Sequence, residues 1–561
     1  MTASLKHAPL IGLLLVALSS FTTLNAQTAE LSELFERWRA FESPQTADGS
    51  YDYSEEAFEK RWPAYLALRD ELAGINTTSW PINAKVDYML IWAEMNGYAF
   101  NQHVLKPWQR DPAFYKVLWT DQSDVPAHEG PTNHAVIEWW QYAKPLSASD
   151  RTDLRSKLQY IPAFYAQAKG NLTGNARELW IAGIRDINTQ VNDLKQLAQE
   201  PELKADRKTQ KAIETAITAT QDLANWLEAQ SDSKTGPSGI GKDYYSWYQR
   251  HVHLVPLNWE DEVMLLKREL ARAWSSLALE EHKNRNLAPL NAADSEAAYQ
   301  SLATKAADEL VEFLAREEIV SVKDYFRPAL EPHLGRYIPS DRRNFFWITA
   351  HLDPKPLYSH FYHWFELARM QYEPHQNPIR RGALLYNIFD SRNEGMATAV
   401  EEFFMQAGLY ENNPRAREIV YILIAQRAAR GLGSLYAHAN ELSMKEAGTI
   451  HADYTPRGWM KTEKELLLFE QHLYMRQPGY GTSYITGKYL MEHTLMNYAK
   501  SLEGSATNHN LIKSYFDGMN SIGNIPVSLG QWELTGTSTL IEEILSSYVP
   551  IEELMRAQKT N

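Results

Sequence analysis

Two neighbouring stretches decide the expected fold: Leu357-Tyr-Ser-His360-Phe-Tyr-His363-Trp-Phe-Glu366 and, about 30 residues later, Asn393-Glu394-Gly-Met-Ala-Thr-Ala-Val-Glu401-Glu402. Both have the residue pattern of a helix, and both carry imidazoles or carboxylates. Such groups on neighbouring helices are the usual way in which an all-helical protein builds a metal or acid–base site. The two stretches therefore predict a helical protein with a functional site between two helices.

The spacing of the polar residues predicts which side chains meet. Pro356 and Pro374 frame the first stretch and limit the expected helix to about four turns. His360 and His363 are three residues apart, so their imidazoles are expected on one face. The carboxylates at Glu394 and two turns later share a face of the second helix.

Helical patterns continue through most of the chain. Segments with few helix breakers predict long helices at 209–228, 259–279 and 292–318. The strongest strand signal is 344–350, which we expect to be an edge strand able to pair with an extended peptide, or a short internal hairpin. The expected fold class is therefore mainly α, with a few short β segments.

The N-terminus has the three parts of a secretory signal peptide over residues 1–26. Lys6 and His7 precede an apolar core at 10–18, and cleavage is expected after Ala26. The apolar core is too short for a membrane anchor, and no later run is long enough to span a bilayer. We therefore expect a periplasmic or secreted protein with no membrane span.

The clearest break after the signal peptide is the Gly/Ser/Pro-rich segment 231–241, a linker or a surface loop. It divides the chain of 561 residues into an N-terminal helical domain, 27–230, and a C-terminal helical, catalytic-like domain, 242–561.

Composition excludes several classes of chemistry. The chain has no cysteine, which excludes disulfides, thiolate metal ligands, lipid attachment at a cysteine and cysteine nucleophiles. The formal net charge is −14 and no basic face is apparent, so nucleic acid is not an expected partner. The expected partner is a small molecule, peptide or oligomer that serves as substrate.

Several motifs occur in the order and spacing of a bacterial family. They are Glu394-Gly-Met-Ala-Thr-Ala-Val-Glu401 with Gly408-Leu-Tyr410, Arg427-Ala-Ala-Arg430 with His438, then Glu470, Tyr474, Pro478-Gly479, Tyr484 and Gly487, and finally Phe516-Asp-Gly518 with Ile525-Pro526. Over nearly the whole mature chain this series resembles the bacterial domain-of-unknown-function 885 proteins. The resemblance implies a large, exported, helical body with a long cleft, similar to zinc peptidases such as thimet oligopeptidase and the thermostable carboxypeptidases.

The zinc motif of that family, HExxPGHHLQ, is degenerate in this chain. Aligned at His363, the leading histidine is Leu357 and the general-base glutamate is Tyr358. The Pro-Gly pair is replaced by Phe361-Tyr362. The peptidase chemistry of the family therefore does not carry over directly.

His360, His363 and Glu394 are the candidate metal ligands. Two imidazoles and a carboxylate are enough protein ligands for one catalytic zinc ion, with a position left for water. His360 is not a ligand position of the family, so it would be a relocated ligand. The alternative is that both histidines are helix-packing residues with hydrogen-bonded rings.

Three residues are candidates to replace the lost general base: Glu366, Glu401 and Glu402. A carboxylate beside the site can accept a proton from water. Glu401 shares a face with the candidate glutamate ligand, and its alternative role is to orient a ligand. In a metal-free enzyme, His363 with Tyr358 or Tyr484 would instead serve as base and acid.

The motifs also supply candidates for binding substrate and stabilising charge. His438, Tyr474 and Tyr484 stand where the family has groups that donate to a developing oxyanion. Arg427 and Arg430 are spaced to bind a carboxylate or sulfate of the substrate. Core packing and ion pairs between helices are the alternative roles of these residues.

Three functions fit these observations. The first is an exported metallopeptidase-like hydrolase, with one zinc ion, acting on peptides or small polymer fragments. The second is a metal-free His/Tyr acid–base enzyme, a lyase or a glycan-directed enzyme, in the same cleft. The third is a non-catalytic protein that keeps the groove and only binds its ligand.

Overall fold

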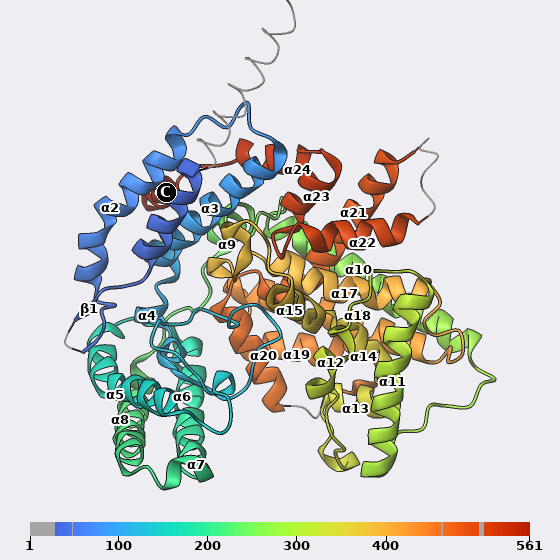
Figure 1. Ribbon diagram of the computed structural model, residues 1–561, viewed down its shortest axis with the longest axis horizontal. Coiled ribbons are helices and arrows are strands. Elements are labelled where there is room, and N and C mark those ends of the chain that lie inside the picture. The colour runs from blue at the N-terminus through green and yellow to red at the C-terminus, as the bar shows by residue number, and fades with distance from the viewer. Residues whose placement is uncertain (1–28, 48, 462–463, 504–509, 561) are drawn as a thin grey trace, which may run out of the picture.

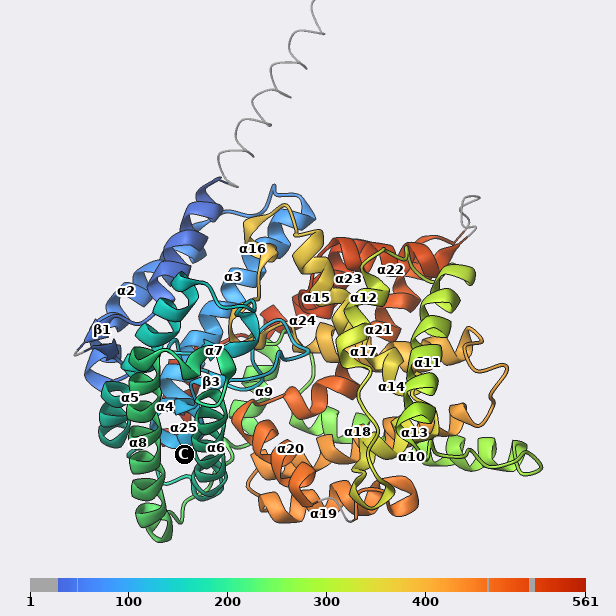
Figure 2. The same cartoon turned by 60° about the horizontal axis from the view of Figure 1, so that its bottom comes forward.

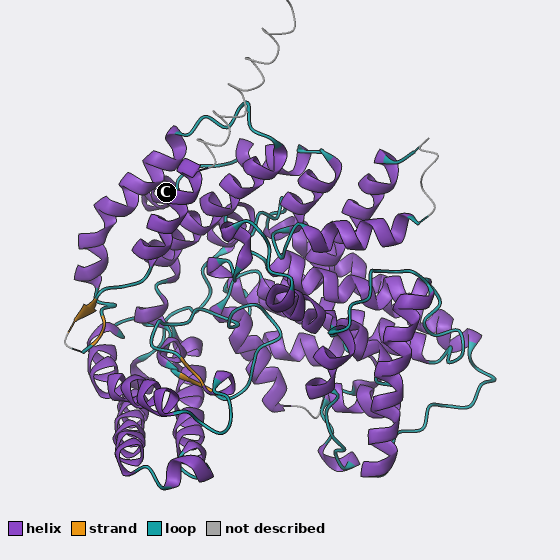
Figure 3. Ribbon diagram, in the orientation of Figure 1, coloured by secondary structure: helices purple, strands orange, loops and turns teal. Residues whose placement is uncertain are grey.

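The computed structural model describes residues 29–47, 49–461, 464–503 and 510–560. The expected signal peptide, 1–26, lies outside the described residues. Helices build most of the described chain, and the named strands form two short pairs (Figure 3). The prediction of a mainly α fold is confirmed.

None of the helices that the structure describes combines the length and the apolar composition needed to cross a bilayer.

The N-terminal part begins with a helix at 29–42 and contains both strand pairs. β1 and β2 pair antiparallel, and β3 and β4 pair parallel. The elements are β1 Thr46–Ala47, β2 Ser50–Tyr51, α2 Glu55–Gly74, α3 Ile82–Phe100, a π-helical turn Asn101–Leu105, α4 Pro107–Arg110, β3 Leu118–Trp119, β4 Ile137–Glu138, α5 Ala148–Asn171, α6 Arg177–Leu197, α7 Pro201–Lys204 and α8 Arg207–Gln230.

The C-terminal part forms the larger body, and its last helix returns to lie beside α3 (Figures 1 and 2). Its helices are α9 Lys242–His251, α10 Trp259–Lys283, α11 Glu296–Arg316, α12 Phe326–Leu330, α13 Phe345–Leu352, α14 Lys355–His360, α15 Tyr362–Tyr372, α16 Pro378–Arg381, α17 Asp390–Gln406, α18 Ala416–His438, α19 Met444–Tyr454, α20 Lys464–Arg476, α21 Tyr480–Ser501, α22 Leu511–Ser521, α23 Val527–Thr535, α24 Thr539–Ser546 and α25 Ile551–Thr560.

Packing divides the chain differently from the expected boundary at 231–241. That segment does connect two helices, α8 and α9. However, buried residues of 31–38 and 65–105 share one hydrophobic core with α9, α10 and α18, whereas α5, α6 and α8 surround a second core, to which Tyr53 and Phe58 also belong. In Figures 1 and 2 these three helices stand as a bundle at one end of the molecule, away from α11 and α13.

Two glycines allow the central helices α17 and α21 to cross at close range. A Cβ added to Gly395 would lie 2.5 Å from Cα of Gly487, and a Cβ on Gly487 would lie 2.6 Å from Cα of Gly395. No real side chain fits in that space, so the crossing requires glycine on both helices. The crossing holds the start of α17, which carries Glu394, against α21, which carries Tyr484.

The predicted strand at 344–350 is wrong, because this run forms helix α13. The side chain of Asn344 accepts a hydrogen bond from the backbone N–H of Trp347 and caps the start of the helix. The aromatic and β-branched residues of the run suit a strand in isolation, but burial of Phe345 and Ala350 against two helical cores decides its structure. No peptide-pairing edge is formed there.

The expected single helix around the histidine pair is interrupted. α14 ends at His360, α15 begins at Tyr362, and Phe361 between them departs from helical geometry with φ −67° and ψ 13°. The backbone therefore turns between the two histidines, one of which ends α14 while the other lies in the first turn of α15.

Candidate functional site

Helices α14, α15 and α17 bring His360, His363 and Glu394 together as predicted. The Nε2 atoms of His360 and His363 lie 3.7 Å and 3.3 Å from the same carboxylate oxygen, Oε2 of Glu394. All three side chains are buried, with 7%, 0% and 1% of their surface exposed. Over the described residues, these three alone form a group of His, Asp or Glu side chains whose potential ligand atoms all lie within 4.8 Å of one another.

The bonding of these atoms fits a metal ion better than simple packing. Nε2 of His363 and Oε2 of Glu394 are buried, and neither has a hydrogen-bond partner of acceptable geometry among the described residues. Leaving such polar atoms unsatisfied is costly in a protein interior. Imidazole nitrogens and a carboxylate oxygen are the donor set that Zn²⁺ prefers in the absence of thiolates. The three residues therefore fit a metal ion.

A buried ion pair supports His360 from behind. Nδ1 of His360 lies 3.0 Å from Oε1 of Glu401, and both oxygens of Glu401 contact Arg427 at 2.6 Å and 2.9 Å. A carboxylate on the far ring nitrogen orients an imidazole and raises its basicity as a ligand. Glu401 thus occupies the position of an orienting group, and Arg427 holds Glu401.

The charged groups of the cluster are the imidazole of His363 and the carboxylate of Glu394, which shift each other's pKa. Burial alone would lower the pKa of His363, but the carboxylates of Glu394, Asp124 and Glu366 outweigh it and raise this pKa to about 9. Burial would raise the pKa of Glu394, yet the facing His363 holds it below its ordinary value. Burial and the nearby Arg427 lower the pKa of His360.

A cavity of about 450 Å³ opens beside His360. Tyr484 stacks on the imidazole of His360, with ring centroids 5.9 Å apart. Arg430 lies 3.8 Å from the ring centroid of Tyr484 and pairs with Glu470 at 2.8 Å. Arg427, Arg430, Tyr474 and Tyr484, all predicted from the motifs, line this cavity together with His360.

Three further residues at the cavity were not predicted: Asp124, Glu129 and Tyr480. The hydroxyl of Tyr480 donates to Glu394 at 2.8 Å and lies 3.4 Å from Glu129. Burial, with the nearby charges of Asp124 and Glu394, raises the pKa of Glu129 to about 8. Tyr480 directly follows Pro478-Gly479, a signal that pointed to this turn, whereas Glu129 precedes His360 by 231 residues and no local pattern connects the two.

Three predicted residues are engaged by other partners. Nε2 of His438 contacts the backbone oxygen of Tyr474 at 2.8 Å, and the described lining of the cavity does not include His438. Glu366 points to Arg392, which it contacts at 2.5 Å, and lines a different cavity. Tyr358 does line the cavity beside His360, but its hydroxyl donates to the backbone oxygen of Leu334, and burial raises its pKa.

These placements correct the prediction that His438 shares a cavity wall with Tyr484. His438 is the last residue of α18, where its imidazole meets the polypeptide backbone of α20. The helix α18 therefore presents Arg427 and Arg430 to the cavity and uses His438 at its end for packing between helices.

Comparison with known proteins identifies structural relatives only. No protein-family model and no curated protein matches the chain. Among solved structures, a candidate lipoprotein of unknown function from Shewanella oneidensis superposes with a TM-score of 0.62 at 18% identity, covering 90% of this chain and 98% of that one. A candidate lipoprotein from Colwellia psychrerythraea gives a TM-score of 0.62 at 15% identity, covering 93% of this chain and 100% of that one. At this identity the likeness establishes a shared fold over nearly the whole chain.

Proposed function

We propose that the protein is a metal-dependent hydrolase in which His360, His363 and Glu394 hold one zinc ion. The observation that carries the proposal is the convergence of two imidazole nitrogens on a single carboxylate oxygen, in a buried cluster beside an open cavity. A zinc ion held there would polarise a carbonyl group and lower the pKa of a coordinated water.

The chain's own residues would supply the remaining functions. Glu129 would take the role of the glutamate that the resembled family carries where this chain has Tyr358. The carboxyl of Glu129 lines the cavity and has a pKa of about 8, so it can exchange a proton near neutral pH. Tyr480 keeps its hydroxyl on Glu394 and fixes that carboxylate. Tyr484, held by Arg430, can donate a hydrogen bond to charge that develops on the substrate.

Peptides or small polymer fragments are the proposed substrates. The cavity lining includes apolar and aromatic side chains beside the charged ones, Trp347, Phe361 and Trp364 among them. Such a lining suits an apolar side chain of a short peptide. Arg427 and Arg430 are both committed to carboxylates of the protein, which makes electrostatic support of the cavity their proposed role.

We also propose that the chain is exported and is a divergent relative of the domain-of-unknown-function 885 proteins. The signal-like N-terminus and the structural likeness to two candidate lipoproteins support export to the periplasm or the medium. The chain lacks cysteine, so a lipid anchor on a cysteine is not available to it. The ordered motifs from Glu394 to Pro526 support the family relationship.

Two observations disfavour the metal-free alternative. Burial raises the pKa of Tyr358 and of Tyr484, whereas a phenol that moves protons at neutral pH needs a lowered pKa. The hydroxyl of Tyr358 is also engaged by the backbone oxygen of Leu334. A binding protein without catalysis is the alternative that hydrolysis assays address.

The test is hydrolysis of a short-peptide library by the mature protein, monitored by mass spectrometry. We expect cleavage that stops after dialysis against a chelator and returns when one equivalent of Zn²⁺ is added. A His363→Ala variant is expected to stay inactive after the same addition. Cleavage that survives complete removal of metal would contradict the proposal, and so would zinc-loaded protein that cleaves no peptide in the library.

A further inference from the structure

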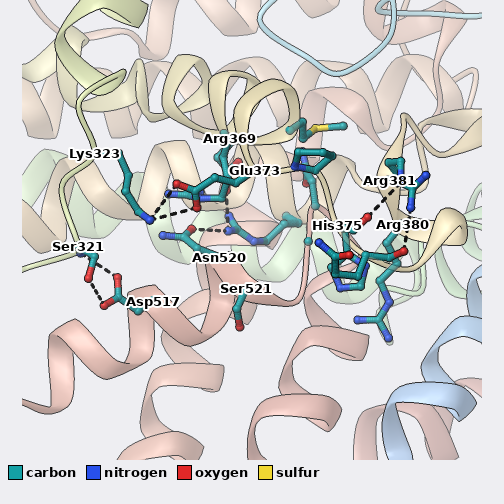
Figure 4. Close-up of a pocket in the computed structure, with 17 residues that line it drawn as sticks. Ser321, Lys323, Arg369, Glu373, His375, Arg380, Arg381, Asp517, Asn520 and Ser521 are labelled. Carbon is teal, nitrogen blue, oxygen red and sulfur yellow. Dashed lines mark hydrogen bonds and ion pairs between the residues drawn. The ribbon is translucent and has the colours of Figure 1, made fainter.

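A second cavity, of about 500 Å³, is lined by the later part of α15 and by segments near 380, 392 and 517–524 (Figure 4). It shares no lining residue with the cavity beside His360. Both cavities nevertheless border the α15–α17 pair, because α15 carries His363 and Glu366 and α17 carries Arg392 and Glu394. The second cavity is not used by the proposed hydrolytic function.

The lining of this cavity carries more positive than negative side chains. Five are cationic and three are carboxylates: Lys323, Arg369, Arg380, Arg381 and Arg392 against Glu366, Glu373 and Asp517. Arg380, however, is paired with two carboxylates outside the lining, Asp87 at 2.6 Å and Glu533 at 2.8 Å. A cation that can attract a negative group of a ligand must lack such a partner.

The carboxylates at the rim are already engaged. Glu373 contacts Lys323 at 2.8 Å, and Figure 4 shows Arg369 on the same side of the cavity. Asp517 accepts hydrogen bonds from Ser321 at 2.6 Å and 2.8 Å. Arg381 donates to backbone oxygens and forms no ion pair with a carboxylate of the described residues. Arg381 is therefore a cation available to a ligand at the rim.

At the floor of the cavity, some hydrogen-bond donor atoms of a buried arginine and some nearby acceptor atoms have no hydrogen-bond partner among the described residues. Arg392 is 1% exposed; its Nη2 atom contacts Glu366 at 2.5 Å and Asn520 at 3.3 Å. Its Nε and Nη1 atoms have no hydrogen-bond partner in the described structure, and neither does Oε2 of Glu366 or Oδ1 of Asn524. Buried polar atoms that remain unpaired cost stability, so four such atoms at one cavity floor indicate a site for a polar ligand.

From this pairing of orphaned donors and acceptors we infer that the second cavity binds an acidic α-amino acid. The α-carboxylate would accept a hydrogen bond from Nη1 of Arg392. The ammonium group would donate to Oε2 of Glu366 and Oδ1 of Asn524. The side-chain carboxylate would meet Arg381 at the rim, which donates to backbone oxygens and forms no ion pair with a carboxylate of the described residues.

Calorimetric titration of the unaltered mature protein tests the inference, with L-glutamate as the probe. We expect saturable binding, weakened at least about tenfold for glutarate, which lacks the ammonium group. The same loss is expected for 4-aminobutyrate, which lacks the α-carboxylate, and for L-2-aminobutyrate, which lacks the side-chain carboxylate. Glutarate that binds as tightly as L-glutamate would overturn the assignment, as would the absence of saturable L-glutamate binding.

Variants locate the site. Arg381→Gln, at the exposed rim, is expected to weaken L-glutamate binding. Arg37→Gln is the control: Arg37 forms an exposed ion pair with Glu71 and does not line this cavity, so L-glutamate binding is expected to be unchanged. The double variant Arg392→Gln/Glu366→Gln removes both members of the buried pair and should abolish binding while circular dichroism shows an intact fold. Undiminished binding by a folded double variant would overturn the site.

Binding measurements alone distinguish this cavity from the proposed hydrolytic site beside His360. Binding of L-glutamate is expected to be unchanged in the metal-free protein, because none of the proposed floor groups is a candidate metal ligand. Loss of all L-glutamate binding on metal removal would place the ligand at the first site and contradict the inference.

Discussion

At the scale of single residues, Glu129 is the group to which the proposed hydrolase assigns proton transfer. Glu129 comes from the segment between β3 and β4 and lines the same cavity as His360. Its neighbour Asp124 belongs to the same segment, so both carboxylates reach the cavity from one loop. In the proposed function, this loop supplies the carboxylate that the resembled family carries where this chain has Tyr358.

Substitution of Glu129 by Gln tests that role. We expect kcat for peptide hydrolysis to fall by about 10²-fold or more, the usual effect of removing a general acid–base group. The zinc content should not change, because Glu129 lies outside the ligand cluster. Asp121→Asn, on the same segment but exposed, is the control and should retain activity. An unaltered kcat in Glu129→Gln would show that the proton is handled elsewhere.

At the scale of elements, the crossing of α17 and α21 positions Glu394, the candidate carboxylate ligand, and it depends on Gly395 and Gly487. Gly395→Ala would push a methyl group to 2.5 Å from backbone atoms of Gly487. We expect the free energy of unfolding to fall by about 1–3 kcal/mol, the usual cost of overpacking a core. Chemical denaturation followed by circular dichroism measures this change.

Gly170→Ala is the matched control for that variant, because Gly170 also lies in a helix, α5, but an added Cβ there meets nothing within 4 Å. It should be neutral or stabilise the protein by about 0.5–1 kcal/mol, since alanine favours helix over glycine. Equal effects of the two substitutions would mean that close packing at the crossing is unimportant.

A buried ion cluster joins α10, α17 and α21 and gives the fold a pH dependence. Glu269 contacts Arg272 at 2.5 Å and Lys488 at 3.2 Å. Burial opposes ionisation of Glu269, but these two cations outweigh it and lower its pKa to about 2. Because the folded-state pKa lies below the unfolded value of about 4.3, the stabilisation is full above that value and is lost as pH falls toward 2.

Glu269→Gln removes this contribution, which is on the order of 3 kcal/mol for a shift of this size. We expect the variant to be less stable than the natural protein at pH 7, and its stability to change less between pH 5 and pH 3. Urea unfolding at these pH values measures both effects. Glu55→Gln, in an exposed pair with Lys106, serves as control. A variant with the unaltered pH profile would contradict the role of the cluster.

At the scale of the whole molecule, the sequence predicted the helical class and much of the central site. The prediction that His360, His363 and Glu394 meet holds because the three residues lie on elements close in the chain, although the single helix expected around the two histidines is divided at Phe361. The motif residues Arg430 and Tyr484 also reach the predicted cavity. The order of the motifs thus captured the part of the site that is built from neighbouring helices.

The failures share a physical cause, which is tertiary packing that local patterns do not encode. The aromatic run at 344–350 has strand propensity, but burial in helical surroundings makes it α13. Glu129 reaches the cavity across 231 residues of chain, and the orientation of His438 is set by the backbone of α20. Such long-range contacts are fixed by how the helices pack, not by spacing along any one of them.

The central claim is that the cluster of His360, His363 and Glu394 binds one metal ion, and elemental analysis of the purified mature protein tests it most directly. We predict about one zinc per chain, lost in His360→Ala and retained in His375→Ala, whose imidazole lines the other cavity. Glu401→Gln should weaken zinc affinity by about 10–100-fold, because it orients His360. Protein that holds no stoichiometric metal after exposure to zinc, or zinc content unchanged in His360→Ala, would contradict the claim.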